Sequence, residues 1–499
     1  MLCDDLASST IRAEYYQCAL SCCDRELESA LWDTFPPRLP RSINGSSTGG
    51  RSILDLPNEI QMEIFLWCPA EFPSHEPTSP PISLSQVCSL WRRLTLEMPN
   101  FWNWMTLDTG IRDYPGYDTS PWRRVDSYSR LQMIMDTWAC RANPHPLHWR
   151  LIVDGTLQPP ESFREAFFSH SPSIQSLDAY FVLPSDFDAL LKTSVIFPNL
   201  SSLKISCLHS DEDPLVDFNL TGRAPRLRSL ALAFRFYTPL HNVNDLHFAN
   251  VTHMDLIRTF MACNLVFDIL KRCVNLQEGA FYTYPSEIPD EGDYAIVQDK
   301  LRSLTILANS EYMSFFPKIE YPSLESLRYG PSDNPTWTVD TPVPTFYQFR
   351  HIQHLTFADF EIEGNQFLAA TLFFTKVESL TLRFRGASEF GLLQKLFDAL
   401  SVDITKETNY LPKLESLTLQ RCKSFPVSEF VRMMSRRARK LSGDADRVSI
   451  LKSVALHFKH HCNASESLAR LMDGRKIKGF RLEVDSEKYC RPVSETGVL

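Results

Sequence analysis

One short apolar pattern recurs along the last two-thirds of this 499-residue chain. It consists of an apolar residue, two variable residues, an apolar residue, one variable residue and a third apolar residue, as in KLRSLTI at 300–306 and KLESLTL at 413–419. Eleven instances begin their apolar positions at residues 174, 200, 227, 251, 276, 301, 324, 352, 377, 414 and 451. The spacing is 23 to 28 residues for eight steps and 37 for the last two. A unit of this length cannot bury its apolar side alone, so the pattern predicts a stack of repeats.

Each instance ends in the alternation of a short half-buried strand, and several intervening segments have helical periodicity, among them 267–270, 367–374 and 391–400. A strand and a helix in each repeat predict an α/β solenoid over residues 147–499. The array resembles leucine-rich repeats of the F-box-associated kind, which implies an irregular horseshoe with parallel strands on the concave face and helices on the convex face. That family also has a buried Asn, Cys or Thr after the third apolar position, which only Asn309, Cys422 and Thr259 match here. A generic α/β domain with coincidental strand patterns is the alternative.

Composition narrows the classes of function. The 60 acidic residues outnumber the 51 basic ones, and the net charge of -9 argues against a general nucleic-acid binder. No apolar run is long enough to cross a bilayer, and the first residues lack a basic and apolar leader. We therefore expect an intracellular protein, cytoplasmic or nuclear, that binds no membrane. Its 13 cysteines are interpreted as small buried apolar residues, although Cys18, Cys22 and Cys23 leave a metal site as an alternative.

The region before the repeats divides into four segments. Residues 1–40 predict a helical lead, and residues 41–52, RSINGSSTGGRS, predict a flexible linker. Residues 53–107 predict a compact helical domain, and residues 108–146 a connecting segment with a helix at 129–141.

The compact domain begins with ILDLPNEIQMEIFL at 53–66. Pro57 suits the first turn of a helix, and Leu56, Ile60 and Ile64 form an apolar stripe with Phe65 beside it. A second helix is predicted from SLSQVCSLWRRL at 83–94, where Ser83 and Gln86 have the spacing of a capping box. A domain of about 55 residues is marginal alone, and apolar helical stripes commonly dock into the groove of a partner.

The order of LPNEI, IF, VCSLWRRL and PNFW resembles the F-box, in a variant common in fungal proteins. The resemblance implies binding to a Skp-type adaptor, and through it to a cullin ubiquitin ligase. Carried over by motif, the adaptor-binding residues are Leu56, Pro57, Ile60, Ile64, Phe65, Val87, Cys88, Trp91, Leu94 and Trp102. Five prolines between residues 69 and 81 depart from a minimal F-box and leave the contacts of its middle helix in doubt. The alternative is that this segment is a helical cap on the repeats.

Sequence motifs for nucleotide binding, metal binding and catalysis are weak in this chain. GSSTGGRS at 45–52 approaches a phosphate-binding loop but has Arg51 in place of lysine and no strand before it, so we interpret it as linker. His457, His460, His461 and Cys462 lie within one short segment without a second pair of ligands. A basic cluster is predicted on one helix and comprises Arg432, Arg436, Arg437, Arg439 and Lys440. We expect no metal, no cofactor and no catalytic residue.

The function we expect is therefore recruitment of a target protein to an SCF-type (Skp-cullin-F-box) ligase. The target would lie on the concave sheet, where variable strand residues project outward: Tyr180, Lys204, Asp255, Tyr282, Arg328, Arg383, Gln420 and His457. Two alternatives remain at this point. One is an F-box scaffold that degrades nothing, and the other is an enzyme whose active site is assembled from dispersed residues.

Overall fold

The chain forms two compact units in a computed structural model, Met1–Asn250 and Val251–Leu499. The structure describes residues 53–68, 80–108, 121–153, 159–181, 195–207, 223–234, 248–284, 296–308, 319–330, 349–360, 364–384, 389–401, 410–422, 425–438, 449–458 and 481–486. The predicted helical lead at 1–40 and the predicted linker at 41–52 lie outside the described residues. No helix in the described ranges is both long enough and apolar enough to span a bilayer.

The first unit begins with short helices. They are η1 (Ile53–Asp55), α3 (Asn58–Leu66), α4 (Ile82–Ser85), α5 (Ser89–Leu96) and η2 (Pro99–Phe101). The prediction of one continuous second helix capped at Ser83 is wrong. The chain breaks between α4 and α5, and Cys88 caps α5 because its Sγ accepts a hydrogen bond from the Trp91 N–H at 3.5 Å.

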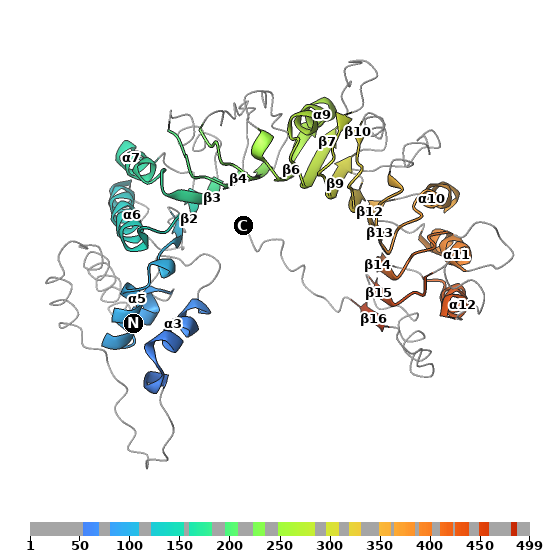
Figure 1. Cartoon of the computed structure of the whole chain (residues 1–499), viewed down its shortest axis with the longest axis horizontal. Coiled ribbons are helices and arrows are strands. Elements are labelled where there is room, and N and C mark those ends of the chain that lie inside the picture. Colours follow the sequence, from blue (N-terminus) through green and yellow to red (C-terminus); the bar gives the residue numbers. More distant parts are fainter. Residues whose placement is uncertain are drawn as a thin grey trace, which may run out of the picture. The chain divides into compact units, whose positions relative to one another are not determined.

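A parallel sheet follows in the first unit, in the order β1-β2-β3-β4-β5. Its strands are β1 (Trp104–Asp108), β2 (Leu147–Val153), β3 (Ile174–Phe181), β4 (Ser202–Cys207) and β5 (Ser229–Phe234). Helices α6 (Pro121–Ala142) and α7 (Glu161–Ser169) lie on one side of it (Figure 1), and η3 (Phe248–Asn250) ends the unit. The sheet begins at Trp104, inside the segment predicted as purely helical, and α6 contains the helix predicted at 129–141.

The second unit continues the same design, in the order β6-β7-β9-β11-β12-β13-β14-β15-β16. Its strands are β6 (His253–Ala262), β7 (Glu278–Tyr284), β9 (Ser303–Ala308), β11 (Ser326–Gly330), β12 (His354–Phe360), β13 (Ser379–Phe384), β14 (Ser416–Cys422), β15 (Ser453–Phe458) and β16 (Arg481–Ser486). Helices α9 (Cys263–Arg272), α10 (Gly364–Thr371), α11 (Glu389–Leu400) and α12 (Val427–Ala438) lie along one side of these strands (Figure 1). Strands β8 (Ile296–Val297) and β10 (Ile319–Glu320) form a separate parallel pair.

All eleven strands predicted from the repeats are confirmed, and within each unit neighbouring repeats pair in the same register. In β9 to β15 the second apolar position aligns from strand to strand, as Leu304, Leu327, Leu355, Leu380, Leu417 and Val454 do. These side chains are at most 3% exposed. Burying a leucine or valine stabilises a fold by about 1.5–3 kcal/mol, so this column forms a continuous core that no single repeat could build.

Neighbouring repeats are also joined just before each strand. The carbonyl of Gln353, for example, accepts the N–H groups of both Glu378 and Ser379 at 2.8 and 2.9 Å, and this arrangement recurs along β9 to β15. In the first unit Asn199 and Asn250 donate side-chain hydrogen bonds to carbonyls of the preceding repeat, at 2.7 and 2.9 Å. These asparagines precede the first apolar residue of their repeats, so they differ from the asparagine position that the family resemblance implied.

Candidate functional site

An apolar surface is exposed at the start of the first unit. Its members are Ile53, Leu54, Leu56 and Ile60, which are 44%, 47%, 38% and 47% exposed, and we call them the α3 surface. Ile53 and Leu54 lie on η1, Ile60 lies on α3, and Leu56 lies in the short connection between them. Large apolar side chains are usually buried in folded proteins, so these four exposed residues make this segment a candidate binding surface.

Helix α3 turns a polar residue inward and an apolar residue outward. Gln61 is 1% exposed and its Nε2 donates to the carbonyl of Leu56 at 2.8 Å, whereas the adjacent Ile60 is 47% exposed. The bond holds the segment before the helix against the helix itself. The orientation is therefore fixed by Gln61 and by the buried Phe65, and it leaves the apolar stripe facing away from the core.

Beneath this surface lies a small aromatic core. The ring of Phe65 meets Trp91 edge to face at 4.8 Å and lies 6.5 Å from Phe101. Leu94 is 2% exposed and packs in the same unit. Aromatic pairs of this geometry add about 0.5–1.5 kcal/mol beyond their buried area. The core therefore supports α3 and α5 as one rigid base.

The ten predicted adaptor residues separate into three groups by exposure in the structure. Leu56, Pro57, Ile60 and Val87 are exposed, and Ile64, Cys88 and Trp91 are half-buried. Phe65, Leu94 and Trp102 are at most 2% exposed. For these three the prediction of direct contact is corrected, because they are enclosed by the chain's own residues and support the surface from below.

Trp102 joins the helical base to α6. Its Nε1 donates to the carbonyl of Thr95 on α5 at 2.9 Å. Its ring meets that of Trp138 edge to face at 4.8 Å, and the guanidinium of Arg141 lies 4.4 Å from its centroid. A cation over a tryptophan face contributes about 0.5–2 kcal/mol. The residue that motif comparison assigned to the adaptor therefore acts as an internal joint.

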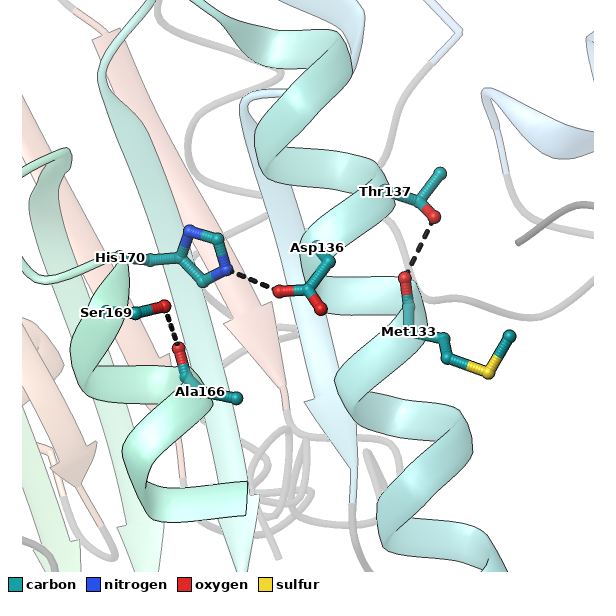
Figure 2. A network of polar contacts seen from close by, with 6 residues as sticks. All are labelled: Met133, Asp136, Thr137, Ala166, Ser169 and His170. Carbon is teal, nitrogen blue, oxygen red and sulfur yellow. Dashed lines mark hydrogen bonds and ion pairs between the residues drawn. The ribbon is translucent and has the colours of Figure 1, made fainter. Parts of the chain in front are cut away.

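Helix α6 is in turn fixed to the first helix of the repeats. Figure 2 shows the carboxylate of Asp136 on α6 directed at the ring of His170, which ends α7, with 2.8 Å between Oδ1 and Nε2. Beside this contact the hydroxyl of Thr137 donates to the Met133 carbonyl, and that of Ser169 donates to the Ala166 carbonyl (Figure 2). The helical base of the α3 surface is thus connected through α6 to α7 by side chains within one unit.

The open face of the sheet carries three parallel rows of side chains. The first row has serine on eight of the eleven repeat strands, as at Ser176, Ser303 and Ser453. The second row in the second unit includes Thr305, Arg328, Thr356, Thr381 and Thr418. The third row, two residues further along each strand, includes Tyr180 in the first unit and Tyr282, Arg383, Gln420 and His457 in the second. The sequence already shows a serine before the second apolar position of most repeats. That these serines form one row on the open face follows only from the strand register in the structure.

All eight predicted target-binding residues lie in these rows. Asp255 and Arg328 are exposed, and the other six, Tyr180, Lys204, Tyr282, Arg383, Gln420 and His457, are half-buried. Arg383, Gln420 and His457 are neighbours in register on β13, β14 and β15. The structure therefore brings these three together, while Tyr180 and Lys204 belong to the first unit.

Lys204 takes part in an ion-pair network of the first unit. Asp178 lies 2.9 Å from Arg150 Nε and 3.7 Å from Lys204 Nζ, and all three residues occupy the second row. Because Lys204 shares its charge with a carboxylate, it is less available to an anionic group of a partner.

The basic cluster predicted on one helix is not a surface cluster. Arg437 is 4% exposed, whereas Arg436 is exposed and Arg432 contacts Asp398. Arg439 and Lys440 lie outside the described residues. The prediction is corrected for Arg437, because its buried guanidinium donates hydrogen bonds to backbone carbonyls of the same unit.

Buried thiols in the second unit are unreactive. Burial raises the pKa of Cys263 to about 11, and it also raises the pKa of Cys273. Since the thiolate is the nucleophile, neither residue is activated at neutral pH. In the described ranges no group of three or more His, Cys, Asp or Glu side chains gathers as a metal site. The segments containing Cys18, Cys22 and Cys23, the loop at 45–52, and His460, His461 and Cys462 lie outside those ranges.

Comparison with known proteins gives no family. No protein-family model and no curated protein matches the chain. Among solved structures 16 chains are similar, one of them the crystal structure of a protein from Bacteroides fragilis. That protein is 11% identical, with a TM-score of 0.28 over 62% of this chain and 74% of the other. A TM-score this low does not establish a common fold.

Proposed function

We propose that this protein is the target-recruiting F-box subunit of an SCF-type ubiquitin ligase. The α3 surface would bind a Skp-type adaptor, and the repeats would hold a target protein. The observation that supports this most is the inverted burial on α3, where Gln61 is enclosed and Ile60 is 47% exposed. An apolar helical face presented outward suits docking into a partner's groove.

The cap interpretation fits this observation less well. A terminal cap covers the apolar end of a repeat stack and shows a polar outer face to water. Here the apolar residues Leu54, Leu56 and Ile60 are 38–47% exposed, so the outer face is the apolar one. We therefore favour a partner-binding unit over a cap.

The repeats suit the second half of the proposal. Parallel strands with helices along one side leave the other side of each strand open, as in a leucine-rich-repeat-like horseshoe. The open rows offer serine and threonine hydroxyls together with larger groups such as Arg328 and Tyr282. A receptor of this kind performs no chemistry, since it raises the concentration of the target near the ligase.

The test is adaptor binding by the full chain. Leu56→Glu and Ile60→Glu should each weaken capture of a purified Skp-type adaptor by tenfold or more, because each places a charge in an apolar contact. Phe390→Glu is the matched control, since Phe390 is 45% exposed on α11 of the second unit and its change should leave binding intact. Binding is measured by pull-down and by size-exclusion chromatography.

The proposal is contradicted if the Leu56→Glu and Ile60→Glu variants both bind the adaptor as tightly as the wild-type chain does. It is also contradicted if the wild-type chain does not bind the adaptor. If the adaptor binds as expected, the proteins captured with it should accumulate when the proteasome is inhibited. An unchanged abundance of every captured protein would favour the scaffold alternative over target degradation.

A further inference from the structure

Arg328 stands out on the open face of the second unit. It is exposed on β11, and its neighbours in the same row are Thr305 on β9 and Thr356 on β12. Adjacent strands lie about 4.8 Å apart, so both hydroxyls are within reach of a group bound by the guanidinium. The row therefore combines one cation with two flanking hydrogen-bond donors.

The neighbouring row adds a second basic group. His354 on β12 is exposed and pairs with Ser326 of β11, which itself pairs with Ser303 of β9. His354 lies two residues before Thr356 on the same face of β12, diagonal to Arg328. We use the name Arg328 seat for Arg328 and His354 together with the neighbouring hydroxyl residues Ser303, Thr305, Ser326 and Thr356.

Among the described strand residues, no carboxylate is paired with a residue of β11 or β12 beside Arg328, whereas Glu278 on β7 lies in the first row, paired with Ser303, and its carboxylate is 3.8 Å from His253 Nε2. At the paired positions of β9, β11, β12 and β13, which the structure describes, there is no aspartate or glutamate. Glu325 and Glu378 precede their strands, and Asp359 lies in the β12 bulge outside the register. In the first unit, by contrast, Asp178 stands in the same row as Arg150 and Lys204.

We propose that the Arg328 seat binds an anionic side chain of a short extended peptide segment in the target protein, a proposal that rests on the proposed function. Arginine binds carboxylate and phosphate oxygens through two parallel hydrogen bonds, and hydroxyl groups can complete the contacts. The same chemistry suits a phosphorylated residue and a glutamate or aspartate. A single arginine in a chain of net charge -9 suits a peptide better than a nucleic acid, which requires many cations.

The length of the segment follows from the register. The row of Arg328 continues through Thr356, Thr381 and Thr418 to Ala455 on β15. Gln420 and His457 lie in the third row beside it, two residues further along β14 and β15. Five strands span about 19 Å, which an extended chain covers with about six residues. The anionic group would lie at one end of the segment, and Gln420 and His457 would meet the other end.

The experiment measures binding of labelled peptides to the full chain by fluorescence anisotropy in about 50 mM salt. The probes are Gly/Ser hexapeptides carrying one phosphoserine, one glutamate pair or no charge, with an oligothymidine of similar size. An anionic peptide should bind more tightly than the uncharged one, and Arg328→Glu should weaken that binding about tenfold or more. Arg436→Glu makes the same charge change on α12, on the helix side of the sheet, and should leave the affinity within about twofold.

Tighter binding of the phosphoserine peptide alone would identify phosphate as the anion, whereas binding of both charged peptides would include carboxylates. Three results overturn the proposal: equal binding of charged and uncharged peptides, an equal loss in Arg328→Glu and Arg436→Glu, or preferred binding of oligothymidine. Adaptor binding is measured in parallel on the Arg328→Glu variant and should be unchanged. Failure of the wild-type chain to bind the adaptor would sink the ligase role, while the peptide measurement would still decide the Arg328 seat.

Discussion

Arg437 illustrates how one residue can order a segment of the second unit. Its Nε donates to the carbonyl of Leu400 at 2.9 Å, and its Nη atoms donate to those of Tyr410, Leu411 and Leu414 at 3.0 to 3.2 Å. The side chain thus joins α12 to the end of α11 and to the turn before β14. Burial lowers its pKa to about 10, so it stays charged at neutral pH and its hydrogen bonds are charge-assisted.

Replacing Arg437 by methionine should lower the free energy of unfolding by about 3 kcal/mol. Methionine keeps the apolar stem but removes the side-chain donor from the carbonyls of Leu400, Tyr410 and Leu414, while the Leu411 carbonyl keeps the Leu414 N–H at 3.1 Å. Each buried unsatisfied group costs about 1–3 kcal/mol before water or relaxation compensates. The measurement is urea unfolding followed by circular dichroism. Arg436→Met, at an exposed position one residue earlier, should stay within about 0.5 kcal/mol, and equal effects of the two changes would refute this role for Arg437.

At the scale of elements, the joint between β1 and β2 depends on His148. Its ring stacks on that of Trp104 with 4.2 Å between centroids, and its backbone N–H donates to the backbone carbonyl of Asn103 at 2.7 Å. Burial lowers the pKa of His148 below the ordinary histidine value of 6.5. The neutral ring is therefore the form that packs best here.

Acidification should weaken the β1–β2 joint. Because the folded-state pKa lies below 6.5, the unfolded chain binds more protons in that range, so this contribution to stability is complete above pH 6.5 and declines as the pH falls toward the folded-state pKa. His148→Phe keeps a flat ring on Trp104 and removes the titration. The urea midpoint of the wild-type chain should therefore fall more than that of the variant between about pH 7.5 and about pH 5. If the urea midpoints of the two chains depend on pH in the same way, protonation of His148 does not change the stability of the fold.

The sequence predicted the repeat strands well because their apolar residues alternate with variable ones, and because a further apolar residue, often leucine, stands three positions before the second. The three other strands of the sheet departed from that pattern. In β2 only one residue separates Leu147 from Trp149, and a register shift against β3 absorbs the missing residue. In β16 the first apolar position holds Gly479. These strands belong to the sheet because of their neighbours, which a local pattern does not contain.

The candidate surfaces could be predicted only in part. The stripe of Leu56, Ile60 and Ile64 was visible in the sequence, but an apolar stripe looks the same whether it faces its own core or a partner. The burial of Gln61 and Phe65 decides the orientation, and it depends on the packing of α3 against α5. Likewise, alternation placed Arg328 on the open face, while the absence of a carboxylate at the paired positions of β9 and β12 follows from strand register.

At the scale of the whole molecule, a stack in which each repeat packs on its neighbours confines damage to the neighbourhood of a lesion. Leu419 on β14 is fully buried, and Leu419→Ala should cost about 2–5 kcal/mol of local stability. Hydrogen exchange measured by mass spectrometry should rise in β13, β14 and β15 and stay unchanged in α3 and β1 to β5. Adaptor binding should be retained, because the α3 surface belongs to the first unit. A uniform rise in exchange across both units would mean that the chain unfolds as one cooperative body, and loss of target binding could then no longer be separated from loss of the adaptor.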